Sequence, residues 1–134
     1  MTDRVLSLDE LAALHCTAQA SDRACAPAQA DAQLRELPGW RREGGSIDRK
    51  FEFSSWLEAL SFVQAVGWMA HCQDHHPDIS LQGQQCQIRW STHSSGGLSR
   101  KDFVCAARTD RLSESFLRGG SSAPQSPPGN DANP

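Results

Sequence analysis

The stretch Ser46–Cys72, SIDRKFEFSSWLEALSFVQAVGWMAHC, decides the fold, because its hydrophobic period changes within a few residues. The first part alternates with a period of two, which predicts a β-strand with Phe51 and Phe53 on its inner side. The second part opens with a capping box at Ser55 and predicts a long apolar helix over 56–72. An apolar helix directly after a half-buried strand indicates a sheet with that helix packed on it.

The same alternation puts Ile47 and Arg49 on the inner side of the strand. Ile47 suits that side, whereas the pattern does not explain the charged Arg49. Upstream, Gly44-Gly45 predicts a turn, which pairs this strand with a second short extended run that begins after Trp40. These residues therefore predict one half of a sheet.

Residues 79–93 predict the other half of the sheet. Gly83-Gln84 marks a bend within them, and the part that follows alternates between apolar and polar side chains, as is typical of a half-buried strand. The inward side of that strand carries Cys86, Ile88 and Trp90. Residues 93–97, HSSGG, are expected to form a loop.

Two helices are expected before the sheet. A capping box from Ser7 to Glu10 opens a short one that carries leucines at positions 8, 11 and 14. Pro27 suits the first turn of the second, which would run through Leu34 and Leu37 and end at Pro38-Gly39.

One helix is expected after the sheet. Ser99 caps it, with Asp102 at the N3 position of another capping box, and it fades near Leu117. The segment that follows, 119–134, is rich in glycine, serine and proline, and it is expected to be disordered.

This order of elements predicts an α+β domain with a mainly antiparallel sheet and helices packed on one face. We divide the chain into an N-terminal helix with a connecting segment (1–26), the main domain (27–118) and the tail (119–134).

The composition narrows the classes of function. The chain has 134 residues and a net charge of −3, so no basic field predicts binding to nucleic acid. It has no apolar run long enough for a membrane span. Its five cysteines are odd in number and include no C-x-x-C motif, which indicates a reduced, cytoplasmic protein without a disulfide framework.

Four of the five histidines fall within residues 71–93, around the motif Asp74-His75-His76-Pro77. His71 and His75 are spaced i and i+4, which on a continuous helix would suit a metal, with His93 as a third ligand. Pro77 opposes that hypothesis because it disfavours a helix around the motif. A polar helix end without chemistry is a further alternative, since a helix C-terminus favours cationic histidine.

The other hypothesis is acid–base chemistry. Histidine donates or accepts a proton at neutral pH, and neighbouring imidazoles disfavour each other's cationic form. One ring can then hold a proton while another acts as a base. A dehydratase, which protonates a leaving hydroxyl and removes a proton nearby, needs such a set.

Together these motifs resemble the pterin-4a-carbinolamine dehydratase family. The specific part is the series Asp74-His75-His76-Pro77, Ser91-Thr92-His93, and Gly96-Gly97-Leu98-Ser99 with Asp102. The upstream residues Leu37-Pro38-Gly39-Trp40 and the strand that follows also fit, so the resemblance covers roughly residues 34–117.

The resemblance implies a four-stranded antiparallel sheet with helices on one face, and assembly as a homodimer or homotetramer. It implies loss of water from 4a-hydroxytetrahydropterin, a step that serves aromatic amino acid hydroxylases and needs no metal or other cofactor. The catalytic residues it implies are His75, His76 and His93, and those expected at the substrate are Asp74, Pro77, Asp102 and His71. Some relatives are transcriptional coactivators, so a non-catalytic interaction module stays an alternative.

Overall fold

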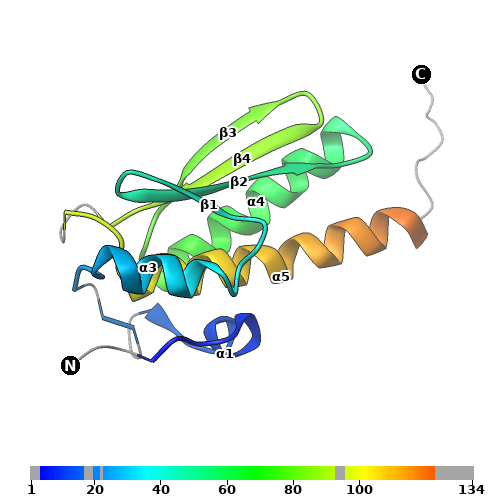
Figure 1. Cartoon of the computed structure of the whole chain (residues 1–134). Coiled ribbons are helices and arrows are strands. Elements are labelled where there is room, and N and C mark those ends of the chain that lie inside the picture. The colour runs from blue at the N-terminus through cyan, green and yellow to red at the C-terminus, as the bar shows by residue number, and fades with distance from the viewer. Residues whose placement is uncertain (1–3, 17–19, 22, 93–95, 123–134) are drawn as a thin grey trace, which may run out of the picture.

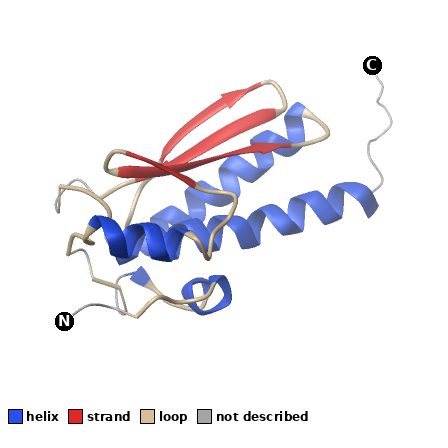
Figure 2. Cartoon of the chain, in the orientation of Figure 1, coloured by secondary structure: helices blue, strands red, loops and turns tan. Residues whose placement is uncertain are grey.

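Four strands form one antiparallel sheet, and the helices cover one of its faces (Figures 1 and 2). The computed structural model describes residues 4–16, 20–21, 23–92 and 96–122, the last six by their backbone alone. The strands are β1 (Arg41–Glu43), β2 (Ser46–Glu52), β3 (Asp78–Gln82) and β4 (Gln85–Trp90), in the order β1-β2-β4-β3. Among the described residues, the helices are α1 (Leu8–Ala12), α3 (Pro27–Leu34), α4 (Trp56–Gln73) and α5 (Arg100–Ser122). The predicted fold class is confirmed.

The centre of the sheet is the pair β2 and β4, whose inner residues face the helices. Ile47 lies opposite Trp90 and Phe51 lies opposite Cys86. All four are at most 4% exposed, and Phe53, just past the end of β2, is 6% exposed. The alternation in both strands therefore predicted their buried side correctly, because a strand turns successive side chains to opposite faces.

Helix α4 packs on this face and begins as expected. The Ser55 hydroxyl accepts the backbone N–H of Glu58 at 3.1 Å, while the Glu58 carboxylate reaches back to the N–H of Ser54, one residue earlier than a regular capping box. Phe62 on the buried side of α4 is fully enclosed. Its ring centroid lies 4.9 Å from that of Phe51 and 5.0 Å from that of Phe53. This aromatic cluster joins the helix to the sheet.

Arg49, which the sequence pattern did not explain, lies on the inner side because it has a buried partner. Its Nη1 donates to Oδ1 of Asp110 on α5 at 2.8 Å, and the same oxygen accepts the indole N–H of Trp40 at 2.9 Å. The guanidinium also lies over the ring of Phe51, at 4.7 Å from its centroid. A paired, stacked guanidinium can occupy an apolar layer at low cost.

Helix α4 leaves its other side in solvent. Leu57 is 65% exposed and Trp68 is 72% exposed, and Trp56 is half exposed at the start of the helix. Within this chain α4 packs against the sheet and against α5, and these exposed side chains lie outside both contacts.

Two helix ends differ from expectation. Helix α3 ends at Leu34 rather than continuing through Leu37, because Pro38 disfavours the helical region for the residue before it and a tighter turn closes the segment. Helix α5 continues to Ser122, beyond the expected end near Leu117. Extending an existing helix costs much less than starting one.

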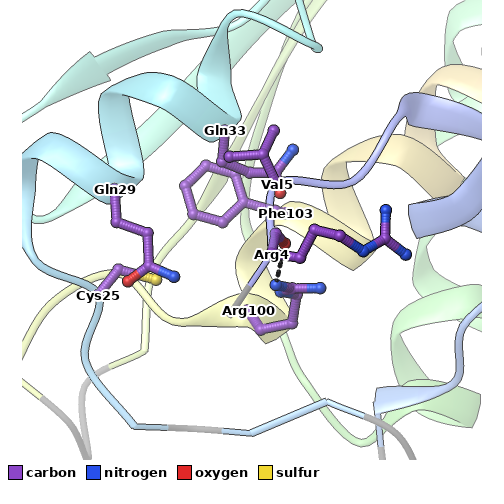
Figure 3. A pocket seen from close by; sticks show the side chains of 7 residues that line it. All are labelled: Arg4, Val5, Cys25, Gln29, Gln33, Arg100 and Phe103. Carbon is purple, nitrogen blue, oxygen red and sulfur yellow. Dashed lines mark hydrogen bonds between the residues drawn. The ribbon is translucent and has the colours of Figure 1, made fainter. Parts of the chain in front are cut away.

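The N-terminal segment packs against α3 and α5 (Figure 3). The side-chain amide of Gln33 donates to the carbonyl of Leu6 at 2.7 Å and accepts its N–H at 3.0 Å. Arg100 at the start of α5 donates to the carbonyl of Arg4. The gap between these side chains holds only about 10 Å³, too little for any ligand beyond a single water. The segment is thus docked on the domain and closes no ligand site there.

The tail was expected to be disordered over residues 119–134. Residues 119–122 continue α5, and residues 123–134 lie outside the described part of the chain, where disorder stays a prediction. Within the described residues, no helix combines the length and apolar character that crossing a bilayer requires.

Candidate active site

The end of α4 positions the histidine motif. The helix stops after Gln73, and Asp74 adopts the left-handed conformation with φ of 52° and ψ of 43°. The N–H of His75 then returns to the carbonyl of Ala70 at 3.1 Å, and that of Asp74 to the carbonyl of His71, which is a Schellman closure. Asp74 tolerates this conformation better than most residues. The closure turns the chain sharply, so that His75 leaves the helix.

The imidazole of His75 is held on two sides. Its Nε2 lies 2.7 Å from Oδ1 of Asp102, near the start of α5. Its ring stacks on the indole of Trp90 with centroids 5.5 Å apart and planes 14° apart. The side chain of His75 is 11% exposed and that of Asp102 is fully buried. The ring is therefore fixed in orientation while an edge remains open to solvent.

Asp102 is itself saturated with donors. Its Oδ2 accepts the Thr92 hydroxyl at 2.7 Å and the backbone N–H of Ser99 at 2.9 Å. Because one oxygen of this carboxylate already accepts two hydrogen bonds, the other oxygen accepts an N–H from His75. We therefore place the ring proton of His75 on Nε2. The bond to Ser99 is also the N3 half of a capping box. Asp102 thus caps α5, as the sequence predicted, and also orients His75.

The other predicted residues lie around this pair in different environments. His76 is exposed, and Pro77 is half-buried beside it. Asp74 is exposed, and its visible contribution is the backbone turn at the end of α4. His71 is exposed on the last turn of α4, where its ring lies edge-on to Trp68 at 6.1 Å.

His93, the third predicted catalytic histidine, lies outside the described residues. The chain around it is placed, because the N–H and C=O of Thr92 both bond to Gly97 across the loop, at 3.1 and 3.2 Å. The loop therefore begins and ends at a backbone pair beside Asp102.

The metal hypothesis required His71 and His75 on one continuous helical face. His75 instead follows the left-handed Asp74, so the i and i+4 relation does not exist in the fold. Among the residues that the structure describes, no three His, Cys, Asp or Glu side chains gather as metal ligands.

A polar pocket of about 410 Å³ opens next to Thr92. Its walls come from the β1–β2 turn, the start of β3, the end of β4 and the loop after it. The lining residues are Gly45, Ser46, Asp78, Arg89, Ser91, Thr92, Gly96 and Gly97. The volume suits a small molecule, and the lining offers both donors and acceptors. Two of its lining residues connect it to the histidine motif: Asp78 directly follows Pro77 in the sequence, and Thr92 donates to Asp102, whereas no described histidine lines the pocket itself.

Sequence reasoning missed three members of this arrangement. Trp90 was expected only to face the core, yet the ring of His75 stacks on its indole. Thr92 was expected only as part of the Ser91-Thr92-His93 motif, and Ser99 only as a helix N-cap. Their hydroxyls also form a hydrogen bond to each other at 2.7 Å, beside Asp102. The signal available was the presence of Ser91-Thr92-His93 and Ser99 within a short span of sequence ahead of Asp102.

The arrangement suits proton transfer. A buried carboxylate behind an imidazole stabilises its cationic form and fixes which nitrogen carries the proton. Because Nε2 of His75 is engaged by Asp102, Nδ1 is the nitrogen that can exchange a proton with a bound molecule. Fold and site together define an α+β protein with a carboxylate-supported histidine at a helix end.

Comparison with known proteins specifies this class further. The family model described as pterin 4 alpha carbinolamine dehydratase matches residues 23–112. The chain belongs to the pterin 4 alpha carbinolamine dehydratase family, which confirms the resemblance seen in its motifs.

Two relatives show how far the likeness extends. A protein of Xanthomonas oryzae pv. oryzae, provisionally named pterin-4-alpha-carbinolamine dehydratase, is 39% identical over 78% of this chain and 92% of its own length. One of Nitrosospira multiformis with the same provisional name is 44% identical over 59% of this chain and 70% of its own length. The likeness therefore spans most of each protein.

A solved structure of a transcriptional coactivator/pterin dehydratase from Brucella melitensis superposes with a TM-score of 0.66. It is 24% identical, over 68% of this chain and 99% of the other. At that identity the likeness concerns the fold alone.

Proposed function

We propose that this protein dehydrates 4a-hydroxytetrahydropterin to quinonoid dihydropterin and water, with histidines as acid and base. The observation that carries the proposal is the imidazole of His75 held by Asp102 at 2.7 Å and stacked on Trp90, within the motif series of the family. A dehydratase needs an oriented proton donor at the leaving hydroxyl, and this pair supplies one.

In the proposed reaction the substrate carries a hydroxyl and an amine nitrogen on one carbon. The nitrogen lone pair expels the hydroxyl as His75 protonates it through Nδ1, and Asp102 stabilises the imidazolium before that transfer. A base then removes the ring N–H proton, so that one water leaves and no net proton is consumed. We assign the base to His93, as the motif implies, and the exposed His76 to binding the substrate or returning the proton. Each such transfer is worth ~10²–10⁴-fold in rate.

We assign the pterin ring to the pocket beside Thr92. The amino-pyrimidine edge of a pterin presents donors and acceptors side by side. Asp78 and the hydroxyl of Ser91 in the lining can pair with such an edge. Product formed there would return to the hydroxylase that uses the pterin, in keeping with a cofactor-recycling enzyme.

We also propose that the protein self-associates through α4. Leu57 and Trp68 are 65% and 72% exposed on that helix, and large apolar side chains in solvent mark contact surfaces. A second copy is the occupant we assign, since the family resemblance implies dimers or tetramers. Trp68→Glu is expected to lower the mass measured by light scattering; an unchanged mass would reject this interface.

The decisive experiment measures dehydration of 4a-hydroxytetrahydropterin by the untagged wild type and by His75→Ala, His76→Ala and His93→Ala. We expect His75→Ala and His93→Ala each to lose at least ~10²-fold in kcat while remaining folded. His76→Ala is expected to affect KM as well as kcat. His15→Ala serves as the matched control, because His15 lies in the N-terminal segment outside the matched family region.

Wild-type rates from His75→Ala would reject the assignment. A wild type with no activity above the uncatalysed rate would instead favour the interaction-module alternative, in which the fold persists without the reaction.

A further inference from the structure

Two buried thiols face each other where the N-terminal segment meets α5. The sulfur of Cys16 lies 3.5 Å from the sulfur of Cys105. Their residues are 1% and 0% exposed. A disulfide requires about 2.05 Å between sulfurs, so the two atoms must approach by roughly 1.5 Å. None of the five cysteines is in a disulfide in this structure.

The two cysteines belong to different parts of the chain. Cys105 lies within the region 23–112 that the family model matches, whereas Cys16 precedes it. The segment that carries Cys16 is held by polar contacts: Arg108 donates to the carbonyl of Leu14, and the N–H of Cys16 donates to Oε1 of Gln73 at 2.7 Å. Figure 3 shows its other end, where Arg100 holds the carbonyl of Arg4. The thiol pair is thus positioned by contacts on both sides.

We propose that Cys16 and Cys105 form a thiol–disulfide pair that closes when the protein meets a peroxide or a small-molecule disulfide. With a peroxide, the Cys16 thiolate attacks one oxygen, the O–O bond breaks, and a sulfenic acid and one water or alcohol form. The Cys105 sulfur then attacks the Cys16 sulfur, the S–O bond breaks, and a second water leaves. Two thiols are oxidised and one peroxide is reduced. With a small-molecule disulfide, the Cys16 thiolate attacks one of its sulfurs, the S–S bond breaks and one small thiol leaves. The Cys105 sulfur then attacks the Cys16 sulfur of the mixed disulfide, and the second small thiol leaves.

The environments of the two thiols predict which sulfur reacts with the oxidant first. The hydrogen bond from the Cys105 thiol lowers the pKa of Cys16, and the charges of Lys101 and Arg108 lower it further. The same contact and burial raise the pKa of Cys105. Cys16 is therefore the thiol that reacts first, and Cys105 is the one that resolves the sulfenic acid. Both are buried, so an oxidant reaches them when the N-terminal segment opens locally.

The bond would anchor the segment to the two helix ends that carry the histidine site. Cys105 lies three residues after Asp102 on α5, and Cys16 is hydrogen-bonded to Gln73, which directly precedes Asp74. The disulfide is independent of the proposed dehydration, because none of its atoms belongs to that reaction.

The test oxidises the full-length protein with hydrogen peroxide and, separately, with oxidised glutathione, and then counts thiols by alkylation and mass spectrometry. We expect the free thiols to fall from five to three per chain, with non-reducing peptide mapping linking the Cys16 and Cys105 peptides. Cys16→Ala and Cys105→Ala should each abolish the link. Cys72→Ala is the matched control, since Cys72 is exposed on α4 and should leave the link intact.

A cross-link through Cys72 or Cys86 instead, or the same loss of two thiols in Cys16→Ala, would overturn the proposal. A free peptide with the sequence around Cys72 serves as a reference for the oxidant dose. If the protein retains all five thiols at a dose that oxidises this peptide, the proposal is also overturned.

Stability gives a second readout. Closing a loop between positions 16 and 105 restricts the unfolded chain, so the oxidised wild type should unfold at a higher urea concentration, and dithiothreitol should reverse the shift. The Cys16→Ala variant should show no shift on oxidation. A lower midpoint after cross-linking would mean that the two sulfurs cannot meet without distorting the fold, and it would refute a disulfide that closes within the native structure.

Discussion

Replacing Asp102 by asparagine separates the two functions of this carboxylate. Three donors converge on it: the His75 ring at 2.7 Å, the Thr92 hydroxyl at 2.7 Å and the Ser99 N–H at 2.9 Å. An asparagine has the same shape but only one acceptor oxygen. We expect that oxygen to stay with Thr92 and Ser99, where it satisfies two donors, and the amide NH₂ to face His75.

The expected cost follows from these bonds. Each charge-assisted hydrogen bond is worth about 1 kcal/mol more than a neutral one, so three of them predict a loss of ~1–3 kcal/mol in the free energy of unfolding. For a chain of this size, ~2 kcal/mol corresponds to a melting temperature roughly 6–10 °C lower. The NH₂ group would also force Nε2 of His75 to accept, which moves the ring proton to Nδ1 and removes the carboxylate from behind the imidazolium. We expect kcat to fall at least ~10²-fold.

The assays are urea unfolding followed by tryptophan fluorescence, the dehydration rate, and nitrogen NMR of the His75 ring. Asp110→Asn is the matched control, because Asp110 is a buried carboxylate on the same helix that serves Arg49 and Trp40 instead of a histidine. It should lose stability to a similar degree and keep its rate per folded molecule. A folded Asp102→Asn variant with an unchanged His75 tautomer and rate would refute the reasoning.

Three further predictions concern the surroundings of the site. Burial raises the pKa of Asp110 against the opposing contacts of Trp40 and Arg49, so between its unfolded value of about 3.9 and its folded value the native state holds the extra proton. Wild-type stability relative to Asp110→Asn should therefore fall as pH rises through that window and level off above it, as urea unfolding from pH 3 to 7 would record. Arg49→Met should lower the free energy of unfolding by ~2–3 kcal/mol, less than for a fully buried ion pair because the Arg49 side chain is 32% exposed. In the Asp110→Asn background the same substitution should cost less. If calorimetry shows the same cost in both backgrounds, the two side chains do not form a direct pair. Asp74→Gly should be more stable than Asp74→Ala by ~1 kcal/mol, since glycine accepts a φ of 52° freely. Wild-type dehydration rates in both variants would assign Asp74 to the helix end, and the same loss of rate in both would assign it to the substrate.

The sequence was most informative where a residue's environment depends on its immediate neighbours. The alternation in β2 and β4 predicted Ile47, Phe51 and Ile88 as buried, and each is at most 3% exposed. Ser55 was identified as a helix cap three residues ahead of its partner. A strand side or a cap is set by the local backbone geometry, so a short window of sequence contains the information.

The same reasoning failed at Asp48. Its place on the outer side of β2 predicts a solvent-exposed carboxylate, but the residue is 1% exposed. Arg41 on β1 donates to it at 3.0 Å, and Arg89 on β4 lies beside it across the other strand pair. Strand pairing brings these arginines over Asp48, and a single strand's pattern does not contain its neighbours.

The histidine site shows the same division. The motif itself determined that His75 and His76 would stand at a helix end, and Pro77 that the helix would not continue past them. Whether His75 would meet His71 in a metal pair or Asp102 in an acid–base pair was decided only in the tertiary structure. The left-handed Asp74 turns His75 out of the helix, and the start of α5 arrives 27 residues later to receive it. Local sequence fixes backbone preference and burial, whereas partners of a polar side chain depend on where distant segments pack.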